Sequence, residues 1–554
     1  RKATGSVTQG QTPGGRFDVT GNYDQDKEVG QFDLKLVGFN ENALRPFLAS
    51  ALGDKRLESI SVNATASAGY NAQAESSVKA DFQLANLIVS DPKQQIPKIP
   101  LEAKFQVDAS LKNKVADIRQ FQFTLTPTER AKNELSLTGQ VDLSQTNGTQ
   151  GTLKLTSQAL DVTRYYDLFA GKKAEAPTAK ATPAPSGTIS NPQPNPNAEP
   201  AAVNLPLRNS SVDVNIARFY LRELEITNLQ TTAKIDGGHV LLKPFQLAIN
   251  GAPVNATVDL NLGVPGYQYD VNLSADKIPI APLANSFSAD YKDRAKGDLI
   301  ANVQLKGAGT TGASLQKSLA GQLSLVFTNA NIQLAPNKFY KNVIGAVALA
   351  LQEPGLTNSP VNYIVVNTKM GEGNINLNQF RIVSDTLSAQ SQGVIPIATV
   401  LTNSPINNWP VEISLKRSLA QKARVVPADA PTNTAYVTLP TFVTVKGTIG
   451  DPNPQINKVV IAQMIAQATG ASKIIEKEAG KYINQVPGLG GLLGGKSGTN
   501  QPASTNKPSA GNVLGNILSG IATNRPQANT NPPSSTNKPS GGNIFDLLPK
   551  IVPK

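Results

Sequence analysis

The sequence predicts a mainly β protein: an extended, curled antiparallel sheet of groove-like form, with short interspersed helices and a disordered C-terminal tail. Apolar and polar residues alternate over long stretches such as 254–262 and 299–305, which is the period-2 pattern of half-buried strands. Between such stretches lie pairs like Asp236-Gly237 and Asn250-Gly251, which suit tight hairpin turns. The pattern contains no long crossover helices, so antiparallel pairing is expected.

Composition narrows the possible functions. The 554 residues carry 52 Lys and Arg against 40 Asp and Glu, a formal net charge of +12, but the basic residues are scattered and aromatic residues make up 5%. Nucleic-acid binding favours clustered basic residues and stacking aromatics, so we expect no nucleic-acid partner.

The residues of catalytic and metal chemistry are also scarce. Cys is absent and His239 is the single histidine, which excludes thiolate nucleophiles and poly-His metal sites. The acidic residues show no pair spaced for general acid and base work. We therefore expect a protein that is not an enzyme, with no catalytic residue, no metal and no cofactor.

The chain divides into five parts by pattern. The region 171–202 is rich in Pro and Ala and separates two β-rich regions, 1–170 and 203–456, so it is expected to be a disordered linker. From 457 to 487 the apolar period becomes helical, which predicts two amphipathic helices with Asn457 as an N-cap. A low-complexity tail, 488–554, follows.

The tail contains a duplicated block, 504–513 and 535–544, and each copy leads into a short apolar stripe. Such stripes are too short to form stable helices alone, and we expect them to dock on an envelope protein partner or a membrane surface. The candidate docking residues are Val513, Leu514, Ile517, Leu518, Ile544, Phe545, Leu547 and Leu548.

The sequence shows no membrane-spanning helix. The longest apolar run, 343–351, has nine residues, and spanning a bilayer takes about 20. The chain opens at Arg1 within a strand-like pattern. We expect the region 1–170 to continue a missing N-terminal part, which would carry any membrane anchor.

A series of short motifs occurs in a distinctive order across 203–456. They are Leu-Glu-Ile-Thr-Asn-Leu (224–229), Ile-Asp-Gly-Gly (235–238), Leu-Leu-Lys-Pro-Phe (241–245), Ala-Pro-Leu (281–283), Leu-Lys-Gly-Ala-Gly (305–309), Ser-Leu-Ala-Gly-Gln-Leu (318–323) and Val-Lys-Gly-Thr-Ile-Gly-Asp-Pro (445–452). This order resembles the C-terminal region of AsmA-type bacterial envelope proteins. The region 1–170 shares the resemblance through a weaker internal repeat.

The resemblance implies a fold and a function. AsmA-like proteins are similar to the repeating β-groove lipid-transfer proteins, in which an apolar groove carries phospholipid or another acyl-chain lipid between membranes. It implies a periplasmic location, anchorage in the inner membrane, and support of outer-membrane assembly. The candidate groove-lining residues are Val254, Ala256, Val258, Leu260, Leu262, Leu299, Ala301, Val303, Leu305, Leu323, Leu325 and Phe327.

Alternation by itself allows a second interpretation. The apolar faces of the strands could pack together as ordinary β-sandwich cores, which is the commoner fate of such faces. The alternative is therefore a structural or adhesive envelope protein built from packed sandwich modules.

Overall fold

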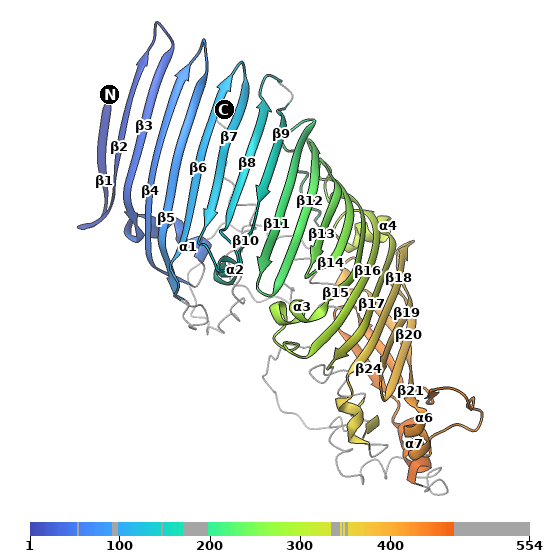
Figure 1. Cartoon of the computed structure of the whole chain (residues 1–554). Coiled ribbons are helices and arrows are strands. Elements are labelled where there is room, and N and C mark those ends of the chain that lie inside the picture. The colour runs from blue at the N-terminus through green and yellow to red at the C-terminus, as the bar shows by residue number, and fades with distance from the viewer. Residues whose placement is uncertain are drawn as a thin grey trace, which may run out of the picture. The chain divides into compact units, whose positions relative to one another are not determined.

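A computed structural model describes residues 1–52, 55–90, 98–145, 148–169, 198–333, 344–345, 347–348 and 353–469 (Figure 1). Within them the strands follow one another in chain order across one large sheet. This confirms the mainly β fold. The predicted docking residues of the tail lie outside the described residues.

The N-terminal strands are β1 (Lys2–Gln9), β2 (Thr12–Asp24), β3 (Val29–Asn40), β4 (Arg56–Asn71), β5 (Ser76–Ser90), β6 (Leu101–Lys112), β7 (Val115–Leu125), β8 (Glu134–Asp142), β9 (Gln150–Ser157) and β10 (Leu160–Asp161). The second group is β11 (Ser210–Leu221), β12 (Leu224–Asp236), β13 (His239–Ile249), β14 (Ala252–Asn261), β15 (Gln268–Pro279), β16 (Ala295–Ala308) and β17 (Ala320–Ile332). The last group is β18 (Val361–Gly371), β19 (Asn374–Ser384), β20 (Leu387–Pro396), β21 (Pro405–Lys416), β22 (Tyr436–Thr438), β23 (Val443–Thr448) and β24 (Pro452–Ile456).

The helices are α1 (Glu41–Leu52), α2 (Thr163–Phe169), α3 (Ile280–Phe287), α4 (Gly312–Ser318), α6 (Arg417–Lys422) and α7 (Lys458–Thr469), with 3-10 turns at Pro354–Asn358 and Leu401–Asn403. The α7 helix lies at the start of the region 457–487, where two amphipathic helices are predicted, and residues 470–487 lie outside the described residues. The Asn457 side chain accepts hydrogen bonds from the N–H groups of Val459 and Val460, as an N-cap does.

The sheet is mixed, so the expectation of a wholly antiparallel sheet is wrong at one junction. Strand β11 runs parallel to β9 and to β10, while the other pairings are antiparallel. A parallel pair needs a crossover, and here α2 and the region 171–197 lie between the paired strands in sequence. The two β-rich regions are therefore one sheet. Among the described strands β1 pairs with β2 alone and β24 with β23 alone, so the expected curl does not bring the sheet edges together.

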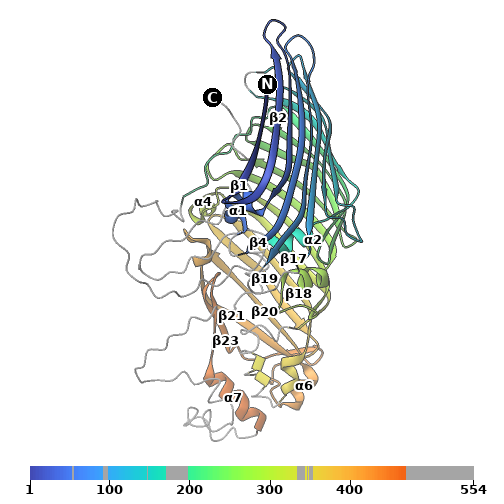
Figure 2. The same ribbon diagram turned by 90° about the vertical axis from the view of Figure 1, so that its left-hand side faces the viewer.

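Helices gather at one end of the strands, which we call the helix rim. There α1 joins β3 to β4, α2 follows β10, α3 joins β15 to β16, and α6 follows β21. The opposite end, which we call the turn rim, carries hairpin turns and α4. Figure 1 shows the helices α1, α2 and α3 toward one end of the long strands, and Figure 2 shows that the strands are bowed.

A line of β-bulges crosses the sheet near the helix rim. Each bulge interrupts the register beside a residue with positive φ: Gly38, Asn86, Asn228, Lys277, Gly297 and Asn329. Gly and Asn tolerate this backbone region better than other residues, and a bulge bends its strand and increases its twist. The strand ends at the helix rim are bent for this local reason.

The tightly packed core lies toward the C-terminal strands. All the largest fully buried side chains fall between residues 347 and 461, among them Leu415, Val443 and Ile461, each 0% exposed. This region is packed like an ordinary globular core.

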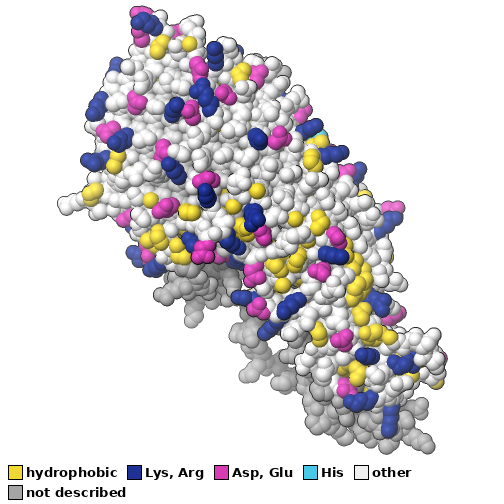
Figure 3. Space-filling model, viewed as in Figure 1, with side chains coloured by type: hydrophobic (Ala, Val, Ile, Leu, Met, Phe, Trp, Pro, Cys, Tyr) yellow, Lys and Arg dark blue, Asp and Glu magenta, His cyan; other side chains and the backbone are white. Residues whose placement is uncertain are grey.

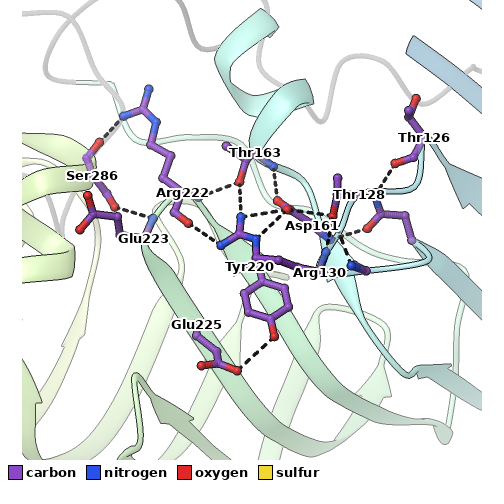
Figure 4. A network of polar contacts seen from close by, with 12 residues as sticks. Thr126, Thr128, Arg130, Asp161, Thr163, Tyr220, Arg222, Glu223, Glu225 and Ser286 are labelled. Carbon is purple, nitrogen blue, oxygen red and sulfur yellow. Dashed lines mark hydrogen bonds and ion pairs between the residues drawn. The ribbon is translucent and has the colours of Figure 1, made fainter. Parts of the chain in front are cut away.

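A polar network fixes the junction between the two β-rich regions (Figure 4). The Arg130 guanidinium donates to the Asp161 carboxylate at 2.8 Å and to the Arg222 carbonyl at 2.9 Å, and it lies over the Tyr220 ring. The backbone N–H of Arg222 donates to the Thr163 hydroxyl at 2.8 Å. The network thus ties the loop after β7 to β10, α2 and β11.

Asp161 is the buried centre of that network, with 5% of its side chain exposed. Burial opposes its ionisation, but hydrogen bonds from the Thr163 hydroxyl and N–H, and then from Arg130, outweigh burial and lower its pKa.

We expect Arg130→Met to lower the free energy of unfolding by about 1–3 kcal/mol, because it leaves the buried Asp161 carboxylate without its cation. Urea unfolding at neutral pH measures the change. Lys132→Met, at an exposed position two residues later, is the matched control. Equal stability of the two variants would contradict this account of the junction.

Residues 198–208, which we call the rim strap, run along the turn rim. The Gly266 N–H donates to the Pro200 carbonyl at 2.9 Å, the Val203 N–H to the Leu262 carbonyl at 2.8 Å, and the Gly237 N–H to the Leu207 carbonyl at 2.6 Å. The expected linker reaches Ala202, but the structure holds its last residues, 198–202, against the sheet.

Glu199 anchors the rim strap to the turn before α4. Its carboxylate accepts hydrogen bonds from the N–H and hydroxyl groups of Thr310 and of Thr311 at 2.6–3.1 Å. Burial opposes ionisation of Glu199, but hydrogen bonds from Ser314, Thr311 and Thr310 outweigh it and lower the pKa to about 2.

A carboxyl group whose pKa is lowered on folding stabilises the folded state above its ordinary pKa, and that contribution is lost as the pH falls toward the folded-state value. We expect Glu199→Gln to lower stability by about 1–2 kcal/mol at pH 7, after allowing for solvent screening. The difference from wild type should shrink between about pH 5 and pH 2. Urea unfolding across this range tests it, with Glu372→Gln in the exposed β18–β19 turn as control. A difference that stays constant with pH would contradict the role given to the carboxylate.

Candidate functional site

One row of side chains crosses the sheet from β1 to β20 and is almost wholly apolar. Cross-strand partners share a face of a sheet, so the printed register identifies the row directly. In order it consists of Ala3, Val19, Leu34, Ala66, Ala80, Val107, Phe121, Leu137, Leu155, Val214, Thr231, Phe245, Ala256, Leu273, Val303, Leu323, Thr368, Leu377 and Gly393.

This apolar row is open to solvent along nearly its whole length. Leu377 is its single buried member, and the others are exposed or half-buried. Val19 and Leu34 are 37% and 36% exposed, which is high for large aliphatic side chains on a sheet face. A continuous apolar surface that solvent reaches is characteristic of a binding surface.

The neighbouring row, on the opposite face, is wholly polar. It runs Thr4, Asp18, Lys35, Thr65, Asp81, Gln106, Gln122, Ser136, Thr156, Asn215, Gln230, Gln246, Asn255, Ser274, Asn302, Ser324, Asn367 and Gln379. One sheet face is thus apolar and the other polar. Figure 3 shows a surface on which Lys and Arg side chains alternate with Asp and Glu over the N-terminal strands.

Of the twelve predicted groove residues, eleven lie in strands that the register brings together on the apolar face. Ala256, Val303 and Leu323 belong to the apolar row itself. Val254, Ala301, Leu325 and Phe327 are buried, at 4–7% exposed, whereas Val258, Leu260, Leu299 and Leu305 are half-buried. Leu262 is the exception, because it lies in the turn after β14.

The prediction missed the N-terminal half of the apolar face. Alternation there places Ala64, Ala66 and Ala68 of β4 beside Leu36, Leu34 and Phe32 of β3. The period-2 pattern was available in the sequence, but the small hydropathy of Ala makes it faint. With the members of the apolar row on the neighbouring strands, these residues extend the same face over β1–β9.

Helices cover the part of this face nearest the helix rim. Leu44, Leu48 and Leu52 of α1 and Leu168 of α2 pack with Leu57, Ile60, Val62, Val89 and Leu101 of the sheet. The half of the face nearer the turn rim carries the apolar row. We call this half the open strip.

Two hollows lie over the sheet, each lined by polar and apolar residues. The larger, about 700 Å³, lies over β13–β19 and is lined by amide side chains such as those of Asn255, Asn302 and Gln322. The smaller, about 480 Å³, lies over β2–β7, where Lys79 pairs with Asp108 at 3.0 Å and Lys104 with Asp81 at 3.4 Å. Both hollows also border residues of the apolar row, among them Leu273 and Val303 in the larger and Ala66 in the smaller.

The single histidine and two basic residues near β21 make local contacts. The Nε2 atom of His239 lies 2.6 Å from Asp259 Oδ1 in an exposed pair. Lys422 pairs with Glu353, and Arg417 donates to backbone carbonyls of Pro431 and Thr434. Within the described ranges no cluster of three or more His, Cys, Asp or Glu is placed to hold a metal ion.

None of the helices in the described ranges has the length and hydropathy to cross a bilayer. The comparisons with known proteins gave one match. No curated protein and no solved structure matches the chain. The sequence model of the AsmA family matches residues 78–380, more than half of the chain and most of the sheet. The chain is therefore a member of the AsmA family, which is associated with the bacterial cell envelope.

Proposed function

We propose that this protein holds or conducts phospholipid in the bacterial envelope, with the acyl chains lying on the open strip. The observation that carries the proposal is the apolar row from Ala3 to Gly393, which crosses the sheet without a charged residue. Covering an exposed apolar surface is worth about 25 cal/mol per Å², and an acyl chain is a continuous apolar ligand of the right form.

In this proposal the polar face of the sheet stays in contact with water. Its rows of amide, hydroxyl and charged side chains keep one side of the sheet hydrated while lipid covers the other. Transport along such a face needs no covalent step, so the proposed activity is non-enzymatic and uses no cofactor. In this proposal the protein works in the periplasm between the inner and outer membranes and supports outer-membrane assembly. An N-terminal segment would anchor it to the inner membrane, and the tail would meet an envelope partner.

The alternative, a structural or adhesive protein of packed sandwiches, finds support in the C-terminal core. Leu387, Ile413 and Phe442 are 1–2% exposed there, as in a sandwich interior. Over β1–β9 such packing is confined to the cluster beneath α1 and α2, and nearer the turn rim Phe32 is 48% and Val78 39% exposed. The packed region therefore supports the adhesive function over the last strands only.

Vesicle transfer tests the proposal. The full chain is mixed with donor vesicles containing fluorescent phosphatidylethanolamine and with unlabelled acceptor vesicles. We expect transfer to accelerate in proportion to protein concentration. A transfer rate equal to that without protein would overturn the proposed function.

A further inference from the structure

Aromatic side chains on the apolar face adopt two arrangements. Phe17, Phe32 and Tyr269 each face a glycine across the strand pair: Gly5, Gly21 and Gly307 respectively. A Cβ atom added to these glycines would lie 2.5–2.7 Å from the aromatic side chain, so each aromatic side chain fills the space over its glycine.

Four phenylalanines have no such glycine. Phe82 of β5 pairs with Phe105 of β6, which pairs with Phe123 of β7, and Phe121 pairs with Val107 and Leu137. The Phe105 and Phe121 rings meet edge to face, with centroids 4.8 Å apart and planes at 87°. Phe105, Phe121 and Phe123 have large partners on both sides, and Phe82 has Ala64 on its other side, so these rings form a cluster of bulky side chains on the apolar face. We call these four residues the phenylalanine ridge.

The phenylalanine ridge packs against other residues at one end and borders a surface of small side chains. Phe82 packs against the cluster beneath α1, which fixes it toward the helix rim. On its N-terminal side the apolar face is floored by small residues, Ala64, Ala66 and Ala68 of β4 and Ala80 of β5. An acyl chain that moves along the open strip therefore passes from small to bulky side chains at β5–β7.

We propose that the phenylalanine ridge is the specificity-determining part of the open strip: it admits straight acyl chains and retards branched ones. This proposal rests on the proposed function and goes beyond it by naming the residues that select the cargo. Phe105 and Phe121 carry the effect most directly, because Phe121 belongs to the apolar row and the Phe105 ring contacts it. The half-buried state of all four side chains leaves them accessible to a passing chain.

The test compares transfer of dipalmitoyl and diphytanoyl phosphatidylethanolamine, whose saturated chains are straight and methyl-branched. For wild type we expect transfer of the straight-chain lipid to be faster by about tenfold, the discrimination typical of an extra methyl group in an apolar site. In Phe105→Ala/Phe121→Ala the ratio should approach one through faster transfer of the branched lipid. The control is Phe17→Ala/Phe32→Ala, which removes the same number of rings from the same face outside the ridge and should keep the wild-type ratio.

A second variant keeps the test decisive if the ridge variant folds poorly. Ala66→Phe/Ala80→Phe adds a second pair of facing rings on the alanine floor, and we expect it to slow transfer of both lipids and to widen the ratio. A ridge variant whose ratio equals that of wild type, or an Ala66→Phe/Ala80→Phe variant with unchanged rates, would overturn the ridge while leaving lipid transfer intact. Wild-type protein that transfers neither lipid would overturn the proposed function, and the ridge with it.

Discussion

Two negative charges placed on the open strip are expected to stop lipid transfer without unfolding the protein. In Ala256→Asp/Val258→Asp both new carboxylates lie on β14 at half-buried positions, where water can reach them. An acyl chain crossing β14 would have to strip that water, and desolvating an unpaired carboxylate is strongly unfavourable. We expect the transfer rate to fall by at least about tenfold, because a tenfold change corresponds to a free-energy difference of only about 1.4 kcal/mol.

The same strand supplies the matched control. Asn255→Asp/Thr257→Asp adds the same charge to β14 on the opposite, polar face. Its transfer rate should remain close to that of wild type, and both variants should keep the wild-type circular dichroism spectrum. If the two variants lose transfer equally, the loss reflects charge in general and not the apolar face.

A charge in the C-terminal core is expected to have the opposite consequence. Leu415 of β21 is 0% exposed and pairs with Leu387 and Val437. Leu415→Asp buries a carboxylate with no cation beside it, so we expect a loss of more than about 4 kcal/mol and unfolding of the last strands. Limited proteolysis and thermal melting measure this, with Leu415→Met as the volume-conserving control.

The contrast between these variants separates an open face from a packed sandwich. A sandwich would unfold in both cases, because its inner faces are buried throughout. A melting temperature for Leu415→Asp close to that of wild type would show that the region around β21 is not the core described above.

The strands were predictable because alternation is a local property of the chain. Stretches such as 254–262 display their two faces without reference to any partner, and turns such as Asn250-Gly251 lie where the structure has them. Asn and Gly also occur at several of the bulges. Single residues of these types are too common in the sequence, however, to predict where a bulge lies.

The continuity of the sheet was not predictable from such patterns. It depends on the parallel pairing of β9 with β11, whose residues are separated by α2 and the region 171–197. That pairing is supported by tertiary contacts between Arg130, Asp161 and Arg222. No periodic pattern in the sequence predicts these contacts. The open strip was only partly predictable for the same reason: its residues can be assigned to one row only when the register of every strand pair is known.

The most direct test of the central claim is native mass spectrometry with lipid extraction on the full chain. If acyl chains cover the open strip, the protein will carry phospholipid in a defined ratio, and Ala256→Asp/Val258→Asp will carry less than Asn255→Asp/Thr257→Asp. Wild-type protein that is free of lipid after mild purification and melts in one cooperative transition would contradict the claim.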